Sequence, residues 1–113
     1  MADALVILDS PGPLPLKVSF DSPGDGSVIF VLSGTAFTQN GGVLIGFNLF
    51  LDGSGIGKPA LCYANLGLNH QAMRTTLIPV DNLAYGSHTI EIAPIDTNTL
   101  TDFNDYFQVT MLY

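Results

Sequence analysis

Glycine, proline and other turn-forming residues interrupt the apolar runs of this chain, and no run continues for more than roughly ten residues. The runs are rich in Val, Ile, Phe and Thr, which favour strands over helices. We therefore expect short β-strands and no helix. The expected strands span residues 4–8, 16–20, 27–37, 43–51, 60–65, 73–80, 88–93 and 106–112.

The segments between these runs are typical of tight turns. Asp52-Gly53 in particular favours a hairpin, because both residue types adopt positive φ readily. Eight short strands in a chain of single-domain length predict an all-β fold, a two-sheet antiparallel β-sandwich of the jelly-roll type. Within that one domain, residues 1–26 would form an N-terminal arm and the first strands, and residues 27–113 the jelly-roll core.

The charge balance excludes several classes of partner. Lys17, Lys58 and Arg74 are the only strong cations against ten carboxylates, which gives a net charge of −7. Such a chain offers no basic surface for nucleic acid or for an anionic membrane. No apolar run is long enough for membrane insertion. Met1–Ala4 lacks the positive charge of a secretory signal, so we expect synthesis in the cytoplasm and action on a particle surface (a virion) or outside the cell after release.

Charged residues make up only 12% of the chain, about half the usual share, so the surface is expected to be unusually apolar. The strands expected at 27–37 and 43–51 are apolar on both faces, whereas a strand of a single sandwich should alternate. A covering loop or the Pro-rich segment near the N-terminus could explain this. We favour contact with a neighbouring subunit. The candidate interface residues are Val28, Phe30, Phe47, Leu49 and Phe50.

Catalytic chemistry has little support in the sequence. Two histidines and one cysteine show neither metal-ligand spacing nor a nucleophile motif. Cys62 lies in an apolar stretch, which indicates a small core residue. His88 opens an expected strand after Gly86-Ser87, where an imidazole commonly bonds backbone groups. We expect no enzymatic activity.

The segment between residues 96 and 105 is the one stretch with ligand chemistry. It gathers three carboxylates and two amides, and calcium takes six to eight such oxygens. The candidates are Asp96, Asn98, Asp102, Asn104 and Asp105, with calcium placed at Asp102, Asn104 and Asp105. A surface loop capped by side-chain to backbone hydrogen bonds is the alternative interpretation, and it stays open.

Two family resemblances bear on function. Residues 42–53, 85–92 and 104–112 resemble the compact bacterial and phage jelly rolls that are built like the complement globular head and tumour necrosis factor. That resemblance implies a tight homotrimer with an apolar axis and a binding or structural role without a cofactor.

The run Asp102-Phe103-Asn104-Asp105 is similar to the ending of bacterial calcium-dependent fucose and mannose lectins. This second resemblance implies that calcium in the loop would hold sugar hydroxyls. The chain departs from those lectins because it has fewer acidic residues and closes on Tyr113 instead of glycine.

These observations predict a non-enzymatic, trimeric structural or attachment protein, such as a virion decoration, head-fibre or receptor-binding protein. The partner would then be the chain itself, together with a protein lattice or a cell-surface glycan. The alternative function is a carbohydrate-binding lectin, with or without calcium. Exposed aromatic rings beside polar groups are the usual sugar-binding device, which makes Tyr85, Tyr106 and His70 the sugar-contact candidates.

Overall fold

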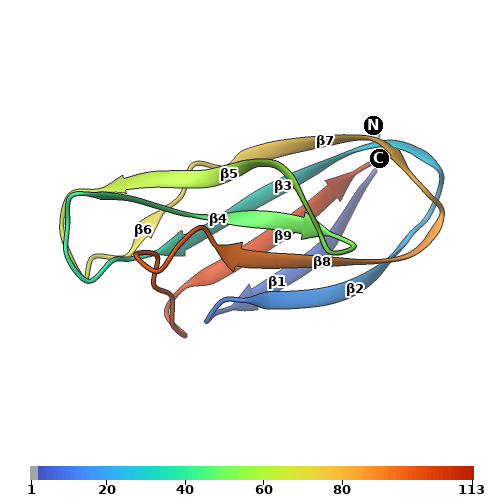
Figure 1. Ribbon diagram of the computed structural model, residues 1–113. Helices are drawn as coiled ribbons and strands as arrows, with labels where there is room; N and C mark the ends of the chain where they lie inside the picture. Colours follow the sequence, from blue (N-terminus) through green and yellow to red (C-terminus); the bar gives the residue numbers. More distant parts are fainter. Residues whose placement is uncertain (1–2) are drawn as a thin grey trace.

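The computed structural model describes residues 3–113, and these residues form nine strands and no helix (Figure 1). The described residues therefore contain no helix that could cross a membrane. The strands are β1 (Ala4–Pro11), β2 (Leu16–Ser22), β3 (Gly26–Ala36), β4 (Val43–Leu51), β5 (Ser54–Ala64), β6 (Gln71–Ala72), β7 (Thr76–Leu83), β8 (Gly86–Pro94) and β9 (Tyr106–Leu112).

The strands make two antiparallel sheets that pack face to face, which confirms the predicted sandwich. One sheet has the order β1-β9-β3, and both β6 and β7 pair with the far edge of β3. The other sheet has the order β2-β8-β4-β5. Because β1 pairs with β9 and β2 pairs with β8, the first strands of the chain are integral to both sheets.

The interior between the sheets is filled by the inward faces of alternating strands. Phe30, Phe47 and Phe107 are fully buried there, and the rings of Phe47 and Phe107 meet edge to face with centroids 5.3 Å apart. Truncating such a ring to alanine typically costs about 3–5 kcal/mol of stability. One apolar core thus holds both sheets together.

The predicted subunit interface is wrong for four of its five residues. Both β3 and β4 carry apolar side chains on two faces. In each strand, the face with more apolar side chains points into the core. The residues that lie in this chain's own core are Val28, Phe30, Phe47 and Leu49, which are 4% exposed or less. Only Phe50 lies on the outer face of β4, and it is half-buried.

The Pro-rich segment between β1 and β2 forms a corner from one sheet to the other, so it is not a free arm. The amide of Gly12 donates to the carbonyl of Asp105, and the amide of Leu14 donates to the hydroxyl of Thr101. The peptide bonds before Pro13 and Pro15 are cis. The corner thereby packs against the loop that precedes β9.

The strand boundaries differ from the expectation at the β4–β5 hairpin and in residues 71–83. Asp52 and Gly53 have φ values of 50° and 86°, which confirms the predicted turn. β5 then begins at Ser54, six residues before the expected strand, because Gly55 and Ile56 pair directly across the hairpin. The two-residue β6 is too short to show alternation in the sequence.

The two ends of the described chain lie side by side. Asp3 and Tyr113 exchange both backbone hydrogen bonds, each at 3.0 Å, so the β1–β9 ladder continues to the last residue. Figure 1 shows both termini at one end of the sandwich, opposite the end that carries β6.

Candidate functional site

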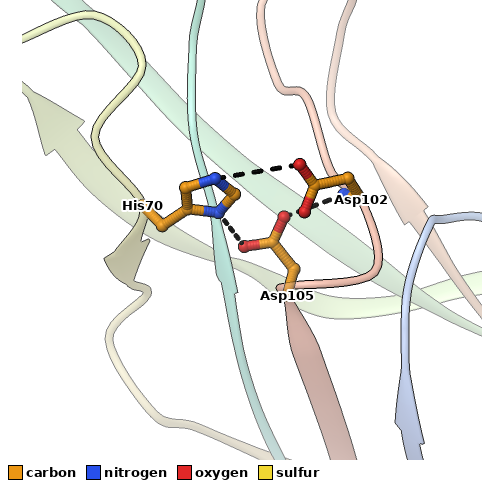
Figure 2. Close-up of side chains that lie close together, drawn as sticks. All are labelled: His70, Asp102 and Asp105. Carbon is orange, nitrogen blue, oxygen red and sulfur yellow. Dashed lines mark hydrogen bonds and ion pairs between the residues drawn. The ribbon is translucent and has the colours of Figure 1, made fainter.

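One histidine and two aspartates meet at the end of the sandwich opposite the termini (Figure 2). His70 comes from the loop before β6, and Asp102 and Asp105 come from the loop before β9. Nδ1 of His70 lies 2.7 Å from Oδ1 of Asp105, and Nε2 lies 3.8 Å from Oδ2 of Asp102. We call these three residues the histidine–aspartate cluster.

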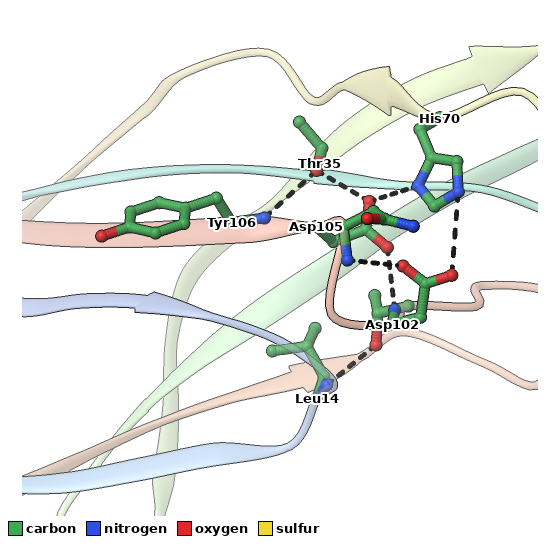
Figure 3. Close-up of polar contacts among 8 residues, drawn as sticks. Leu14, Thr35, His70, Asp102, Asp105 and Tyr106 are labelled. Atoms are coloured by element: carbon green, nitrogen blue, oxygen red, sulfur yellow. Dashed lines mark hydrogen bonds and ion pairs between the residues drawn. The ribbon is translucent and has the colours of Figure 1, made fainter.

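Asp105 is the centre of the cluster and is fully buried. Its Oδ1 accepts hydrogen bonds from Nδ1 of His70 and from the hydroxyl of Thr35, both at 2.7 Å (Figure 3). Its Oδ2 accepts a bond of 2.9 Å from the amide of Asp102. The same hydroxyl of Thr35 accepts a hydrogen bond from the amide of Tyr106. One carboxylate therefore joins β3, the loop before β6 and the loop before β9.

The Asp105 carboxylate raises the pKa of His70 above 6.5, chiefly through the hydrogen bond at Nδ1. The imidazole also packs against Phe37, with ring centroids 4.3 Å apart and the ring planes tilted by 40°. The hydrogen bond from His70 gives the buried Asp105 carboxylate a partner, as buried charged groups require.

A calcium ion fits this donor set poorly. The ligand atoms lie within 4.8 Å of one another, but one of the three is a histidine nitrogen, and calcium prefers oxygen. Three of the roughly four acceptor positions of Asp105 are already used by protein donors. Asp102 would be the main carboxylate left for an ion. The calcium site proposed from the sequence therefore stays a prediction.

The other acidic-loop candidates cap turns in their own loop. The Asp96 carboxylate accepts a hydrogen bond from the amide of Asn98, and the Asp102 carboxylate accepts one from the amide of Asn104. In both cases the partners are two residues apart. These are the side-chain to backbone bonds that Asp and Asn commonly form in turns. Asn98 also lines a small pocket of about 180 Å³. The remaining lining residues of that pocket are Thr38, Gln39, Asn40, Val43, Thr97 and Leu100.

The structure does not bring the three predicted sugar contacts together. Tyr85 is 72% exposed in the turn between β7 and β8, while His70 belongs to the cluster at the opposite end. Tyr106 begins β9, and its hydroxyl bonds Asp9, which raises the pKa of the phenol.

His88 forms a second histidine–carboxylate pair near the other end of the sandwich. Its Nδ1 donates to Oδ2 of Asp52 at 2.6 Å, and its Nε2 donates to the carbonyl of Ala84 at 2.7 Å. Two acceptors for two ring nitrogens favour the imidazolium, so the pKa of His88 is raised, chiefly by Asp52. The ring packs beside Phe20. These contacts are structural, as expected for a histidine that opens a strand.

Sequence reasoning missed a groove at β4 and β5. It is a groove of about 450 Å³ on the outer side of β4 and β5, and we call it the β5 groove. Leu44 lies opposite Tyr63, and Gly46 lies opposite Leu61. Its lining residues are Leu44, Lys58, Pro59, Leu61, Cys62, Tyr63, Arg74 and Thr76.

Gly46 shapes the floor of the β5 groove. A Cβ atom at this position would lie 2.1 Å from the carbonyl oxygen of Ala60 and 2.7 Å from a methyl carbon of Leu61. The absent side chain therefore lets Leu61 lie close against β4. Tyr63 stands beside this floor with 55% of its surface exposed. The result is an apolar surface with an accessible aromatic ring.

The comparisons with known proteins identify the fold and no close relative. No protein-family model matches the sequence, and no curated protein matches it. Among solved structures, a family 35 carbohydrate-binding module from Clostridium thermocellum is similar, with a TM-score of 0.52 and 9% identity over 96% of this chain and 91% of that one.

Two further solved structures resemble the chain. The family 35 module of Cellvibrio japonicus Abf62 has a TM-score of 0.55 at 12% identity and covers 92% of this chain and 67% of that one. A family 36 module of a multidomain xylanase from the hindgut metagenome of Trinervitermes trinervoides has a TM-score of 0.52 at 15% identity and covers 98% and 97%. At these identities the likeness shows the jelly-roll fold. It does not support the resemblance to the complement head and tumour necrosis factor, or a phage origin.

Proposed function

We propose that this protein is a non-catalytic carbohydrate-binding domain and that it binds sugar in the β5 groove. The single observation that carries the proposal is the exposed ring of Tyr63 beside an apolar floor in a groove of about 450 Å³. Sugar rings present apolar C–H faces and peripheral hydroxyls, so they pack on aromatic rings while polar groups at the rim fix their orientation.

The lining of the groove supplies both kinds of contact. Leu44 and Leu61 lie beside Tyr63 and extend the apolar surface along the two strands. Lys58 and Arg74 offer hydrogen-bond donors at the rim, and Thr76 offers a hydroxyl. The fold similarity to isolated carbohydrate-binding modules over nearly the whole chain supports the same proposal.

The decisive experiment measures polysaccharide binding by affinity electrophoresis and on a glycan array, with Tyr63→Ala as the test variant. We expect roughly tenfold weaker binding or a complete loss, because the stacking surface is removed. Tyr85→Ala is the matched control, since Tyr85 is more exposed than Tyr63 but lies outside the groove. Equal binding by both variants would contradict the assignment of the site, and no binding by the native chain would contradict the function.

A glycan-binding domain also suits the attachment role that the sequence indicated, since attachment to a cell surface can proceed through its glycans. The homotrimer and the location on a particle surface stay predictions. Light scattering on the native chain tests the first: a mass of three chains would support it, and a monomer would exclude it.

A further inference from the structure

Two of the three strong cations of this acidic chain line the same groove. Lys58 and Arg74 both belong to the lining of the β5 groove, while Lys17 lies away from it on β2. All ion pairs among residues 3–113 are made by the two histidines, so neither Lys58 nor Arg74 is paired with a carboxylate there. With ten carboxylates available in the chain, two unpaired cations in the lining of one groove need an explanation.

The backbone positions of the two cations are fixed by local contacts. The amide of Arg74 donates to the carbonyl of Leu61 on β5, and the carbonyl of Arg74 accepts the hydroxyl of Thr76. Lys58 follows Gly57, whose φ of 65° belongs to the irregularity in the β4–β5 ladder between Phe47 and Leu49. Arg74 therefore approaches the groove from beyond the edge of β5, and Lys58 approaches from within that strand.

From this arrangement we propose that the β5 groove selects glycans that carry anionic groups, either carboxylates or sulfate esters. The inference rests on the proposed carbohydrate-binding function and specifies its ligand. Tyr63, Leu61 and Leu44 provide the surface for the sugar rings, and Lys58 and Arg74 provide the partners for the acid groups. Guanidinium pairs with planar carboxylates and with sulfate-like oxyanions through paired N–H donors, so both sources are chemically suited.

The overall charge of the chain strengthens this selection. An anionic polymer is repelled by a surface with a net charge of −7, so it can dock only where the local field is positive. The β5 groove is lined by both a lysine and an arginine, whereas the small pockets at Asn98 and at Ser22 are lined by neither. Repulsion elsewhere would therefore orient a bound polyanion along this groove.

The test compares matched glycans that differ only in charge. Polygalacturonate is compared with its methyl-esterified form, and a sulfated galactan is compared with its desulfated form, by isothermal titration at low and at moderate salt. We expect at least one acidic member to bind roughly tenfold more tightly than its neutral partner, with the advantage falling as salt rises. The pair that shows the effect identifies carboxylate or sulfate as the ligand group.

Lys58→Gln and Arg74→Gln should each reduce the preference for the acidic glycan over its neutral partner. The double variant should abolish that preference. Lys17→Gln is the matched control, because it makes the same change of charge outside the groove. Lys58 and Arg74 are both exposed, so the fold should persist, and thermal melting of each variant verifies it. Lys58→Glu should weaken the binding of acidic glycans further than Lys58→Gln does, because it places a negative charge in the groove.

The outcomes separate this inference from the proposed function. Equal binding of acidic and neutral partners that is lost in Tyr63→Ala would overturn the inference and keep the function. Acidic binding that falls as much in Lys17→Gln as in the groove variants would also overturn it, since it would reflect general charge. Failure of every glycan to bind would overturn both proposals.

Discussion

The histidine–aspartate cluster and the β5 groove are opposite kinds of surface. In the cluster, both carboxylate oxygens of Asp105 accept hydrogen bonds from protein donors, and this residue is fully buried. In the groove, Lys58 and Arg74 form no ion pair within the described chain, and Tyr63 is half exposed. The cluster has the residue types of an active site or a metal site, whereas the groove has an ordinary composition.

If the groove binds glycans as proposed, the difference means that available hydrogen-bonding and apolar groups indicate a binding site better than residue type does. Buried polar groups in folded proteins are nearly always hydrogen-bonded, and such groups contribute to stability. A ligand needs groups that the protein has left available. By that criterion the hydrogen bonds of Asp105 serve the fold, and the groove is the proposed binding site.

The largest expected effect is on stability, and it tests the structural role of the cluster. Asp105→Asn removes the charge that holds His70 and leaves poorly matched partners in a buried position. We expect a loss of about 2–4 kcal/mol in the free energy of unfolding, measured by urea denaturation. Glycan binding by the folded variant should be unchanged. A folded, stable variant that no longer binds glycans would instead make the cluster the binding site.

A smaller effect concerns pH and the second histidine–carboxylate pair. The folded-state pKa of His88 is raised above 6.5, so the pair stabilises the fold fully below that pH, and the contribution is lost as pH rises through the folded-state value. The pKa of Asp52 is lowered from 3.8, chiefly by His88, so the contribution also falls as pH drops toward acid.

We therefore expect His88→Gln to lower the free energy of unfolding by less than about 1 kcal/mol, because Asp52 is half exposed. The loss should be largest between the pH at which Asp52 gains a proton and the pH at which His88 loses one. Unfolding free energies of the native chain and the variant at several pH values provide the measurement. The difference should shrink above neutral pH as His88 loses its proton. A difference that grows with pH would contradict the assigned protonation.

The smallest expected effect is that of calcium. Because protein donors occupy Asp105, adding calcium or EDTA should change the melting temperature by less than about 1 °C, measured by differential scanning calorimetry. Asp102→Asn serves as the companion variant. A clear rise in melting temperature that depends on Asp102 would show that calcium displaces these hydrogen bonds and would restore the loop as a metal site.

The fold was largely predictable because its signals are local. Turn residues such as Asp52-Gly53 and short runs rich in Val, Ile, Phe and Thr act over a few positions, and they indicated a sandwich correctly. The orientation of the two-faced strands was not predictable, since only packing against the opposite sheet decides whether Phe30 or Ile29 turns inward.

The candidate site escaped prediction for the same reason. Lys58 and Arg74 are sixteen positions apart, and long-range contacts such as the bond between the Arg74 amide and the Leu61 carbonyl bring their segments together. His70 and Asp105 are likewise joined by long-range pairing. The one available signal for the groove was that Leu44, Leu61 and Tyr63 are apolar side chains on the outer face. The solvent-exposed face of a sheet normally carries polar side chains.

The backbone exchange between Asp3 and Tyr113 has a consequence for how this domain can be used. Because both ends of the described chain lie next to each other, the domain can be inserted into a surface loop of another protein without distorting that protein. The β5 groove spans the start of β4 and the end of β5, which lie toward the far end of the sandwich (Figure 1). In such an insertion, the β5 groove would face away from the protein that carries the domain.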